Sequence, residues 1–426
     1  MINGYFCIIE YGCLCSEEYA KASSKGNIIL PKEIFKQLEN FALENSEFLT
    51  IGYKKGLGKI LKAQNYVGLI QTKSNVVIEI LPKIYSEESD GSYERTRKIF
   101  LKMLMSLKNT SFKSINLSSL KSGKLPIFDV FIKMFLGELS TLIKKGLKSN
   151  YISLEGNEKF YKGKLLVNKH IAQNIVHKER FFIEFDDYSK NRPENKLIKA
   201  ALLFLKTKTN NFNLQSQIDK FIFTMNEIEA SKNIEKDLSK CTGSRLMSEY
   251  DIIVKWCKIF LKHESFTNYK GNNVAYALLF PMEKVFESYV AKAMKDSQYF
   301  RNWAIYSQDR GRYLIENPQK FALRPDIVIK QNDSVLILDT KWKLLNNEAS
   351  NNFGISQGDM YQMYAYAKKY NCEDIFLLYP RNEFVMNLKN EIRFTYEGNL
   401  KLHVFFIDLD NIRGSLKELS AKINKK

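Results

Sequence analysis

The sequence predicts a multi-domain α/β protein. Helical and strand patterns alternate from Val274 onward, which is typical of a sheet with helices packed on it. The chain has 426 residues, more than one ordinary domain contains, and its 45% hydrophobic content allows two or three compact cores. We expect a small mixed α+β domain at residues 1–90, a mainly helical region with a basic segment at residues 91–268, and an α/β domain at residues 269–426.

The N-terminal domain is expected to combine one helix with a β meander. Residues 30–45, LPKEIFKQLENFALEN, place apolar side chains at helical spacing after Pro31. From Glu47 to Ile84, strand patterns are separated by the turns KKGLG and QTKS, which predicts an antiparallel meander. The polar, acidic stretch SEESDGSYER then follows and is the best linker candidate in the chain.

The middle region reads as helical from Arg95 to Lys148, where Met and Phe stripes are typical of a packed core. Basic and aromatic residues then alternate between Tyr161 and Leu205, and a helix is expected to open near Pro193. Such a segment suits phosphate contacts combined with base stacking, with an ordinary solvated face as an equal alternative. The candidates for nucleic-acid contact are Lys162, Lys164, Lys178, Arg180, Lys190 and Arg192.

Composition favours a polyanionic partner. The 65 Lys and Arg residues exceed the 47 Asp and Glu residues, which gives a formal net charge of +18 and indicates nucleic acid, with an acidic membrane surface as the alternative. No long apolar stretch and no basic signal-peptide start is present, so we expect a soluble, cytoplasmic protein without a membrane partner. The six cysteines lack zinc-site spacing and are expected to be reduced thiols, and four histidines offer little material for a His-based site.

The segment Leu323–Lys343, LRPDIVIKQNDSVLILDTKWK, carries the strongest chemical signal. Asp326 begins one strand pattern, and a hairpin over the QND turn should bring it near Asp339 at the end of the next. Asp339 and Lys341 are two residues apart and therefore leave the same face of a strand. Two carboxylates together with substrate phosphate oxygens suit Mg²⁺, and the ammonium can reach the attacking water or the scissile phosphate. An Asp-x-Lys tripeptide alone is weak, because a surface ion pair at a strand end is commoner; its context gives it weight.

Neighbouring helices offer supporting groups. The helix expected near Leu279–Met294 carries Glu283 and Glu287 on one face, of which we prefer Glu287 as a further acid, and the Thr340 carbonyl is another candidate ligand. In the helix expected near Gly358–Tyr370, Gln362 and Tyr366 lie at i and i+4 and can orient phosphate or the lysine, with simple amphipathic packing as the alternative. A strand, DIFLLYP, and a basic amphipathic helix at residues 411–426 complete the pattern.

At these motifs the chain resembles the McrC family, the nuclease subunits of modification-dependent McrBC restriction systems. The segments RPDIVIK, LILDTKWK, SQGDMYQMYAYA and LLYP occur in the family's order, and YKGKLL, FDDYSKNRPENKLIKAALLFL and VGLIQTKSNVVIEILPKI resemble its preceding regions. The resemblance implies a PD-(D/E)XK restriction-endonuclease-like core. In that core, Asp326, Asp339 and Lys341 correspond to the catalytic triad, Glu287 to the supporting helix acid, and Gln362 with Tyr366 to the accessory motif. Thr340 and Trp342 depart from the simplest family pattern without disturbing the acid-x-Lys spacing.

The resemblance also implies a function and a partner. We expect a Mg²⁺-dependent endonuclease subunit, with Mn²⁺ as a substitute, that cleaves modified double-stranded DNA with an McrB-like AAA+ GTPase ring and stimulates its GTP hydrolysis. No G-x-x-x-x-G-K-[ST] motif occurs in this chain, so GTP binds only through the partner. Lys54 and Lys55, in a glycine-containing turn, are candidate partner contacts, with an ordinary exposed hairpin as the alternative. A non-catalytic DNA-binding activator of a partner NTPase and an RNA-directed nuclease are the alternative functions.

Overall fold

The computed structural model divides into two compact units. The first comprises Met1–Ile127 and Ser265–Lys426, and the second comprises Phe128–Glu264. The three consecutive domains expected from the sequence are not tested by this division and stay a prediction. The structure describes residues 4–19, 27–74, 76–84, 90–107, 126–241, 247, 249–261, 274–332, 334–346, 348–382 and 392–424.

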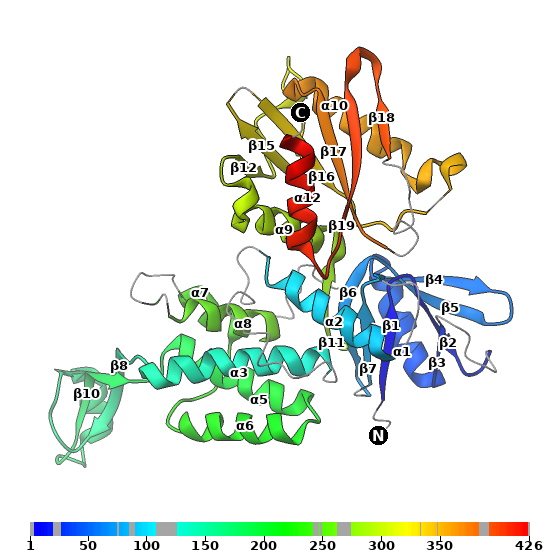
Figure 1. Ribbon diagram of the computed structural model, residues 1–426. Coiled ribbons are helices and arrows are strands. Elements are labelled where there is room, and N and C mark those ends of the chain that lie inside the picture. Colours follow the sequence, from blue (N-terminus) through cyan, green and yellow to red (C-terminus); the bar gives the residue numbers. More distant parts are fainter. Residues whose placement is uncertain are drawn as a thin grey trace. The chain divides into compact units, whose positions relative to one another are not determined.

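Two four-stranded sheets build the N-terminal part of the first unit (Figure 1). One has the order β3-β2-β5-β4, from β2 (Cys13–Ser16), β3 (Asn27–Leu30), β4 (Leu49–Lys54) and β5 (Gly58–Ala63). The other has the order β1-β7-β6-β11, from β1 (Tyr5–Ile9), β6 (Tyr66–Thr72), β7 (Val77–Leu81) and β11 (Val274–Pro281).

The expected single meander is wrong at one connection. The β4–β5 and β6–β7 hairpins are both antiparallel, but β5 and β6 lie in different sheets. Strand β5 pairs instead with β2 from the start of the chain. Alternating side chains reveal that a strand exists but not which neighbour it pairs with, so the sequence pattern could not separate the two hairpins.

Two helices pack on these sheets. Helix α1 (Lys32–Glu44), where the sequence predicted it, buries Ile34, Leu38 and Phe41 in the core of the N-terminal part. Helix α2 (Asp90–Leu104) is held by Arg97, whose Nη2 lies 2.6 Å from Oε2 of the fully buried Glu79 on β7. The expected linker is wrong from residue 90 onward, where α2 begins; residues 86–89 lie outside the described residues.

Strand β11 connects the N-terminal and C-terminal parts of the first unit. It pairs antiparallel with β6 from Tyr66 to Thr72, and the close approach requires Gly68, where an added Cβ would lie 2.0 Å from the Leu278 carbonyl oxygen. Helix α9 (Met282–Asp296) follows β11 directly. The helix expected near Leu279–Met294 therefore begins three residues later than predicted, because Leu279–Pro281 complete the ladder with β6.

The C-terminal part of the first unit is a six-stranded mixed sheet of order β12-β15-β16-β17-β19-β18, which confirms an α/β architecture. Strands β16, β17 and β19 are parallel, whereas β12, β15 and β18 are antiparallel to their neighbours. The bounds are β12 (Ala304–Ser307), β15 (Ile327–Gln331), β16 (Ser334–Thr340), β17 (Asp374–Pro380), β18 (Arg393–Thr395) and β19 (Lys401–Ile407). A small separate hairpin is formed by β13 (Tyr313–Ile315) and β14 (Lys320–Ala322).

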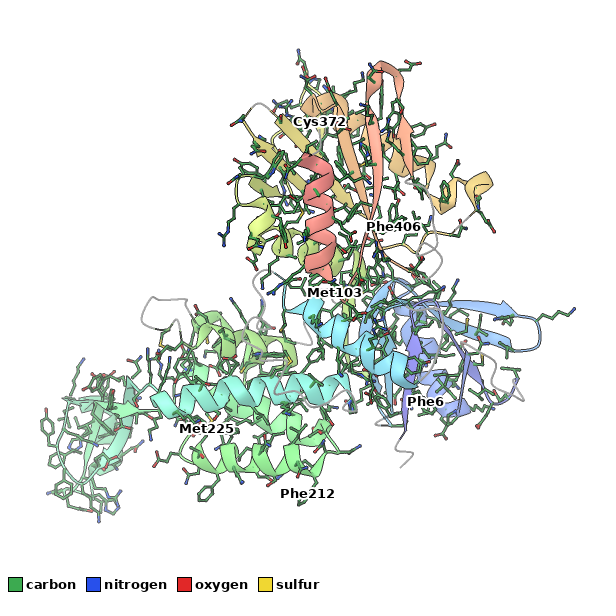
Figure 2. All side chains as sticks on the ribbon, in the orientation of Figure 1. Phe6, Met103, Phe212, Met225, Cys372 and Phe406 are labelled. Atoms are coloured by element: carbon green, nitrogen blue, oxygen red, sulfur yellow. The ribbon has the colours of Figure 1, made fainter. Side chains whose placement is uncertain are left out.

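Helices α9, α10 (Gln357–Tyr370) and α12 (Ile412–Asn424) accompany this sheet, and the last two lie where the sequence predicted helices. Cys372 belongs to a core that Phe406 packs against, and both are labelled in Figure 2. Strand β16 is central and its last four residues are buried, as its continuous apolar pattern predicts.

The second unit is helical with one small sheet. Its helices are α3 (Ile127–Lys145), α5 (Pro193–Lys208), α6 (Phe212–Thr224), α7 (Ile234–Lys240) and α8 (Asp251–Leu261). The sheet contains β8 (Asn150–Glu158), β9 (Lys164–Leu165) and β10 (Phe181–Ser189), with α4 (Val167–Asn174) between the last two strands. Across the described parts of both units, no helix is long and apolar enough to span a bilayer.

Candidate active site

The β15–β16 hairpin brings the first carboxylate to the end of β16. Ile327 pairs with Leu338, so the register brings Asp326 to the level of Asp339, next to Thr340. The Thr340 backbone N and Oγ1 donate hydrogen bonds to Asp326 Oδ2 over 2.8 and 2.6 Å. Thr340, a candidate ligand from the sequence, thus orients Asp326 through its amide and hydroxyl.

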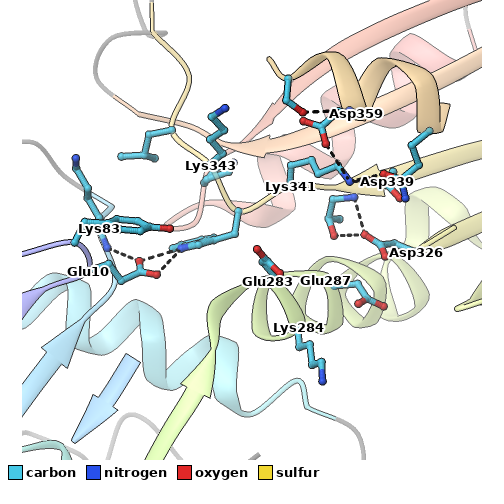
Figure 3. Close-up of a pocket in the computed structure, with 17 residues that line it drawn as sticks. Glu10, Lys83, Glu283, Lys284, Glu287, Asp326, Asp339, Lys341, Lys343 and Asp359 are labelled. Atoms are coloured by element: carbon cyan, nitrogen blue, oxygen red, sulfur yellow. Dashed lines mark hydrogen bonds and ion pairs between the residues drawn. The ribbon is translucent and has the colours of Figure 1, made fainter. Parts of the chain in front are cut away.

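Asp339 and Lys341 meet on one face of the same strand end. Lys341 Nζ lies 2.8 Å from Asp339 Oδ2, 3.5 Å from Asp359 Oδ1 and 2.9 Å from Gln362 Oε1 (Figure 3). The Asp339 side chain is only 2% exposed, whereas that of Lys341 is 23% exposed. The carboxylate is therefore fixed inside the protein, and the ammonium reaches the open side.

Helix α10 provides the acceptors for Lys341. Ser356 Oγ accepts from the Asp359 amide and caps the helix, so Asp359 and Gln362 lie in its first turns. Gln362 Nε2 donates to the Tyr366 hydroxyl over 2.7 Å, and the buried Tyr366 thereby holds Gln362. Asp359 was missed from the sequence, although its i, i+3 spacing to Gln362 was a usable signal.

Helix α9 provides two more acids at different places. Glu287 Oε1 accepts from Gln308 Nε2 over 2.7 Å, and its charge acts on Asp326. Glu283 Oε1 instead accepts from Asn65 Nδ2 of the N-terminal part over 3.2 Å. Of the two, Glu287 is the acid with an electrostatic tie to the carboxylate pair.

These groups line one pocket of about 710 Å³. The pocket brings together the predicted residues Asp326, Asp339, Lys341, Glu287 and Gln362, and Tyr366 supports them from beneath. It also contains Glu10, Tyr11 and Lys83 from the N-terminal part of the same unit. Sequence analysis missed these three, since nothing in the local pattern signals a contact between positions so far apart in the chain.

The two aspartates of the pocket are costly to ionise, although the Lys341 charge offsets part of that cost. Burial raises the pKa of Asp326, and the Glu287 charge raises it further. Burial raises the pKa of Asp339 as well, and the neighbouring Asp326 charge adds to the effect. Two buried carboxyl groups thus repel each other where a positive charge would favour both in their ionised form.

The donor set fits a hard divalent cation. Asp339 Oδ2 is buried, and the partner described for it is the Lys341 ammonium, 2.8 Å away. Mg²⁺ is commonly held by one or two carboxylates plus substrate phosphates rather than by an all-protein cage. The described residues contain no cluster of three or more His, Cys, Asp or Glu side chains with metal-binding geometry, so the fit rests on the carboxylate pair.

The basic candidates lie in the second unit, and they differ in exposure and in the residues that they contact. Lys162, Lys164 and Lys178 are exposed, and Lys162 Nζ lies 3.5 Å from the Phe185 ring centroid. Arg180 is partly buried, and Lys190 pairs with Glu227 over 3.3 Å. Arg192 lies at the start of α5 and contacts the buried Glu194 and the Ser149 carbonyl, while its role in DNA contact stays a prediction.

Lys54 and Lys55 lie at the turn of the β4–β5 hairpin, as predicted. Both are exposed, and Gly56 adopts a φ of 83° that the tight reversal requires. The neighbouring Tyr53 is 80% exposed. The hairpin tip therefore presents one aromatic and two cationic side chains to solvent.

Comparisons with known proteins agree with this architecture. A family model described as McrBC 5-methylcytosine restriction system component matches residues 61–380. The fold is similar to a chain in the half-complex from the tetradecameric assembly of Thermococcus gammatolerans McrB AAA+ hexamers with bound McrC, with a TM-score of 0.71 and 17% identity over 97% of this chain and 100% of that one. A chain in the cryo-EM structure of the T. gammatolerans McrBC complex matches with a TM-score of 0.48 and 17% identity over 68% of this chain and 87% of that one. No curated protein matches.

In the metal-free protein, Asp339→Asn should remove a pH-dependent loss of stability. A carboxyl group whose pKa is higher in the folded state stabilises the fold while protonated. This contribution is complete below the unfolded value of about 4 and is lost as the pH rises to about 7. The Tm of the wild type should therefore fall relative to that of the variant across this window. Melts in chelator from about pH 4 to about pH 8 measure the difference, with the exposed Asp296→Asn as the control. A constant difference between wild type and Asp339→Asn would contradict the expectation.

Proposed function

The chain belongs to the family of McrBC 5-methylcytosine restriction system components, and we propose that it is the metal-dependent endonuclease subunit of such a system. The observation that carries the proposal is the convergence of Asp326, Asp339 and Lys341 at the end of β16, in one pocket with Glu287. The proposed substrate is modified double-stranded DNA. The arrangement has the composition of a phosphodiester-cleaving site with a PD-(D/E)XK core.

The two aspartates and the helix acid have separable roles in this proposal. Asp326 and Asp339 would hold Mg²⁺ or Mn²⁺, with Glu287 and the Thr340 carbonyl as supporting ligands. When bound, the cation polarises the scissile phosphate and activates water. Thr340 holds the Asp326 carboxylate in place through two hydrogen bonds. The carboxylate is therefore already positioned for the cation, and binding costs no further loss of side-chain entropy there.

Lys341 acts as a cation rather than as a base. Burial alone lowers its pKa, but the Asp339 and Asp359 carboxylates outweigh burial and raise the pKa overall. The side chain therefore stays an ammonium at neutral pH, able to stabilise the charge that develops on the phosphate. Gln362 and Asp359 aim it, and Tyr366 aims Gln362.

The proposed partner is an McrB-like AAA+ GTPase ring. The similar T. gammatolerans assembly contains McrB AAA+ hexamers with bound McrC. We assign contact with the ring to the exposed β4–β5 tip with Lys54 and Lys55, and DNA contact to the basic surface of the second unit. A non-catalytic activator would have no use for a carboxylate pair held against its own repulsion, so the geometry favours cleavage over that alternative.

Asp339→Ala should abolish cleavage while leaving partner binding intact. Loss of an outer-sphere partner of a metal site costs about 10- to 100-fold, so removal of a direct ligand should lower the cleavage rate by more than about a hundredfold. The measurement is Mg²⁺-dependent cleavage of modified DNA with the partner and GTP, beside melting curves. Asp296→Ala, which removes an exposed carboxylate at the end of α9, serves as the control. Near-wild-type cleavage by Asp339→Ala would reject the assignment.

Replacing Lys162, Lys164 and Lys178 together by Gln should weaken DNA binding and flatten its salt dependence. Each phosphate contact that is lost lowers the slope of log K against log salt by about 0.9. Binding titrations at several salt concentrations give the slope. Replacement of three other exposed lysines of the second unit, Lys220, Lys232 and Lys240, is the matched control. Equal slopes for the two triple variants would argue against a specific basic surface.

Lys54→Glu combined with Lys55→Glu should reduce stimulation of the partner's GTP hydrolysis. The charge reversal changes the exposed tip without touching the core, so the Tm of this chain should move by less than about 2 °C, in line with a surface change of about 0.5 kcal/mol or less. GTP turnover is measured as a function of the concentration of this chain. Lys36→Glu, on the exposed face of α1, is the control. If stimulation survives undiminished, the hairpin is not the contact.

A further inference from the structure

A buried carboxylate of the N-terminal part reaches the chain segment that follows Lys341. Glu10 directly follows β1 and is only 1% exposed. Its backbone N donates to the Leu81 carbonyl over 2.9 Å, and its Oε2 accepts from the Lys83 backbone N over 2.9 Å. Both the main chain and the side chain of Glu10 are thus fixed to the β1–β7 end of the N-terminal sheet.

The other partner of Glu10 is Trp342. The indole Nε1 lies 3.1 Å from Oε1 and 3.0 Å from Oε2, so one N–H is shared by both carboxylate oxygens (Figure 3). The indole ring also packs against Phe286, with 5.4 Å between the ring centroids and a tilt of 57°. Phe286 is fully buried on α9, next to Glu287. Trp342 therefore touches both the N-terminal sheet and the acid-bearing helix.

Trp342 directly follows the last residue of this segment that is hydrogen-bonded to the neighbouring strand β17. Strand β16 ends at Thr340, and the Lys341 backbone N makes a last hydrogen bond to the Leu378 carbonyl over 2.9 Å. Beyond it, the Lys343 backbone N turns back to the Lys341 carbonyl. The contacts of the Trp342 side chain with Glu10 and Phe286 therefore anchor the chain just where the ladder of β16 ends.

We propose that Glu10 is a positioning residue for the nuclease centre, which it serves by holding Trp342 and thereby the backbone of Lys341; the proposal rests on the nuclease function proposed above. Burying a carboxylate is costly even with the Lys83 charge nearby, so a role in fixing local conformation is a natural reason for its presence. In the described part of the chain, the hydrogen-bond donors to this carboxylate are the Trp342 indole and the Lys83 amide. The N-terminal part is then one wall of the active site and not only a docking module.

Trp342→Phe is the most direct test, because it keeps the ring on Phe286 and removes the N–H. We expect its cleavage rate with partner and Mg²⁺ to fall at least about tenfold, in the range of lost supporting contacts at metal sites. DNA affinity and stimulation of the partner's GTP hydrolysis should stay near wild-type values, while the Tm should fall only by the cost of removing one donor from the buried Glu10 carboxylate. Glu10→Ala should show the same pattern, and Glu10→Gln should restore part of the rate, since its amide oxygen still accepts from the indole. Trp303→Phe and Glu39→Gln are the matched controls in the same unit.

The Glu10→Ala/Trp342→Phe double variant decides whether the two residues act together. If they do, it should cleave no more slowly than the slower single variant; multiplied effects would overturn the proposal.

Hydrogen exchange provides a readout that does not need cleavage. The amides of residues 340–343 should exchange faster in Trp342→Phe than in wild type and Trp303→Phe. Unchanged exchange in Trp342→Phe would also overturn the proposal. If the exchange difference is present but the wild type does not cleave DNA, the nuclease function alone is rejected.

Discussion

The pairing of β6 with β11 is the interaction on which the rest of the first unit depends. It places a strand from the second half of the chain at the edge of the N-terminal sheet, and Gly68 allows the two backbones to approach. Because α9 begins at Met282, directly after β11, the helix that carries Glu283 and Glu287 starts from that sheet. The same contact that completes the N-terminal core therefore fixes where the helix that forms one wall of the candidate active site begins.

The candidate active site lowers the stability of the unit that contains it. Asp326 and Asp339 are buried close enough to raise each other's cost of ionisation, and only part of that cost is offset by the Thr340 hydrogen bonds and the Lys341 ammonium. Sites with strongly shifted pKa values are often functional for this reason. The mixed sheet tolerates the two buried carboxyl groups because β16 is flanked by β15 and β17. The buried apolar residues Ile337 and Leu338 hold the strand in place next to Asp339.

Local patterns in the sequence were sufficient for the centre of the site. The alternation around the QND turn predicted the β15–β16 hairpin, and the spacing of Asp339 and Lys341 placed both on one face. Helical spacing placed Gln362 and Tyr366 on one face, where the structure has them in contact, and Lys341 was one of the two targets considered for them. What escaped prediction depends on pairing between distant segments: the separation of β5 from β6, the continuation of β11 to Pro281, and the approach of Glu10 to Trp342. No periodicity within a single segment encodes its neighbour, so these features required the fold.

The place of β11 has a consequence for how this protein can be divided. The motif-bearing region after residue 268 looks self-contained in the sequence, yet it begins with a strand whose hydrogen-bonding partner, Tyr66–Thr72, lies far upstream in the chain. A fragment that keeps β11 without β6 would carry a bare apolar edge, open to association with other chains. A fragment without β11 would expose the corresponding edge of β6. Each half therefore needs the other to cover its open strand edge, so the two are expected to fold well only when present together.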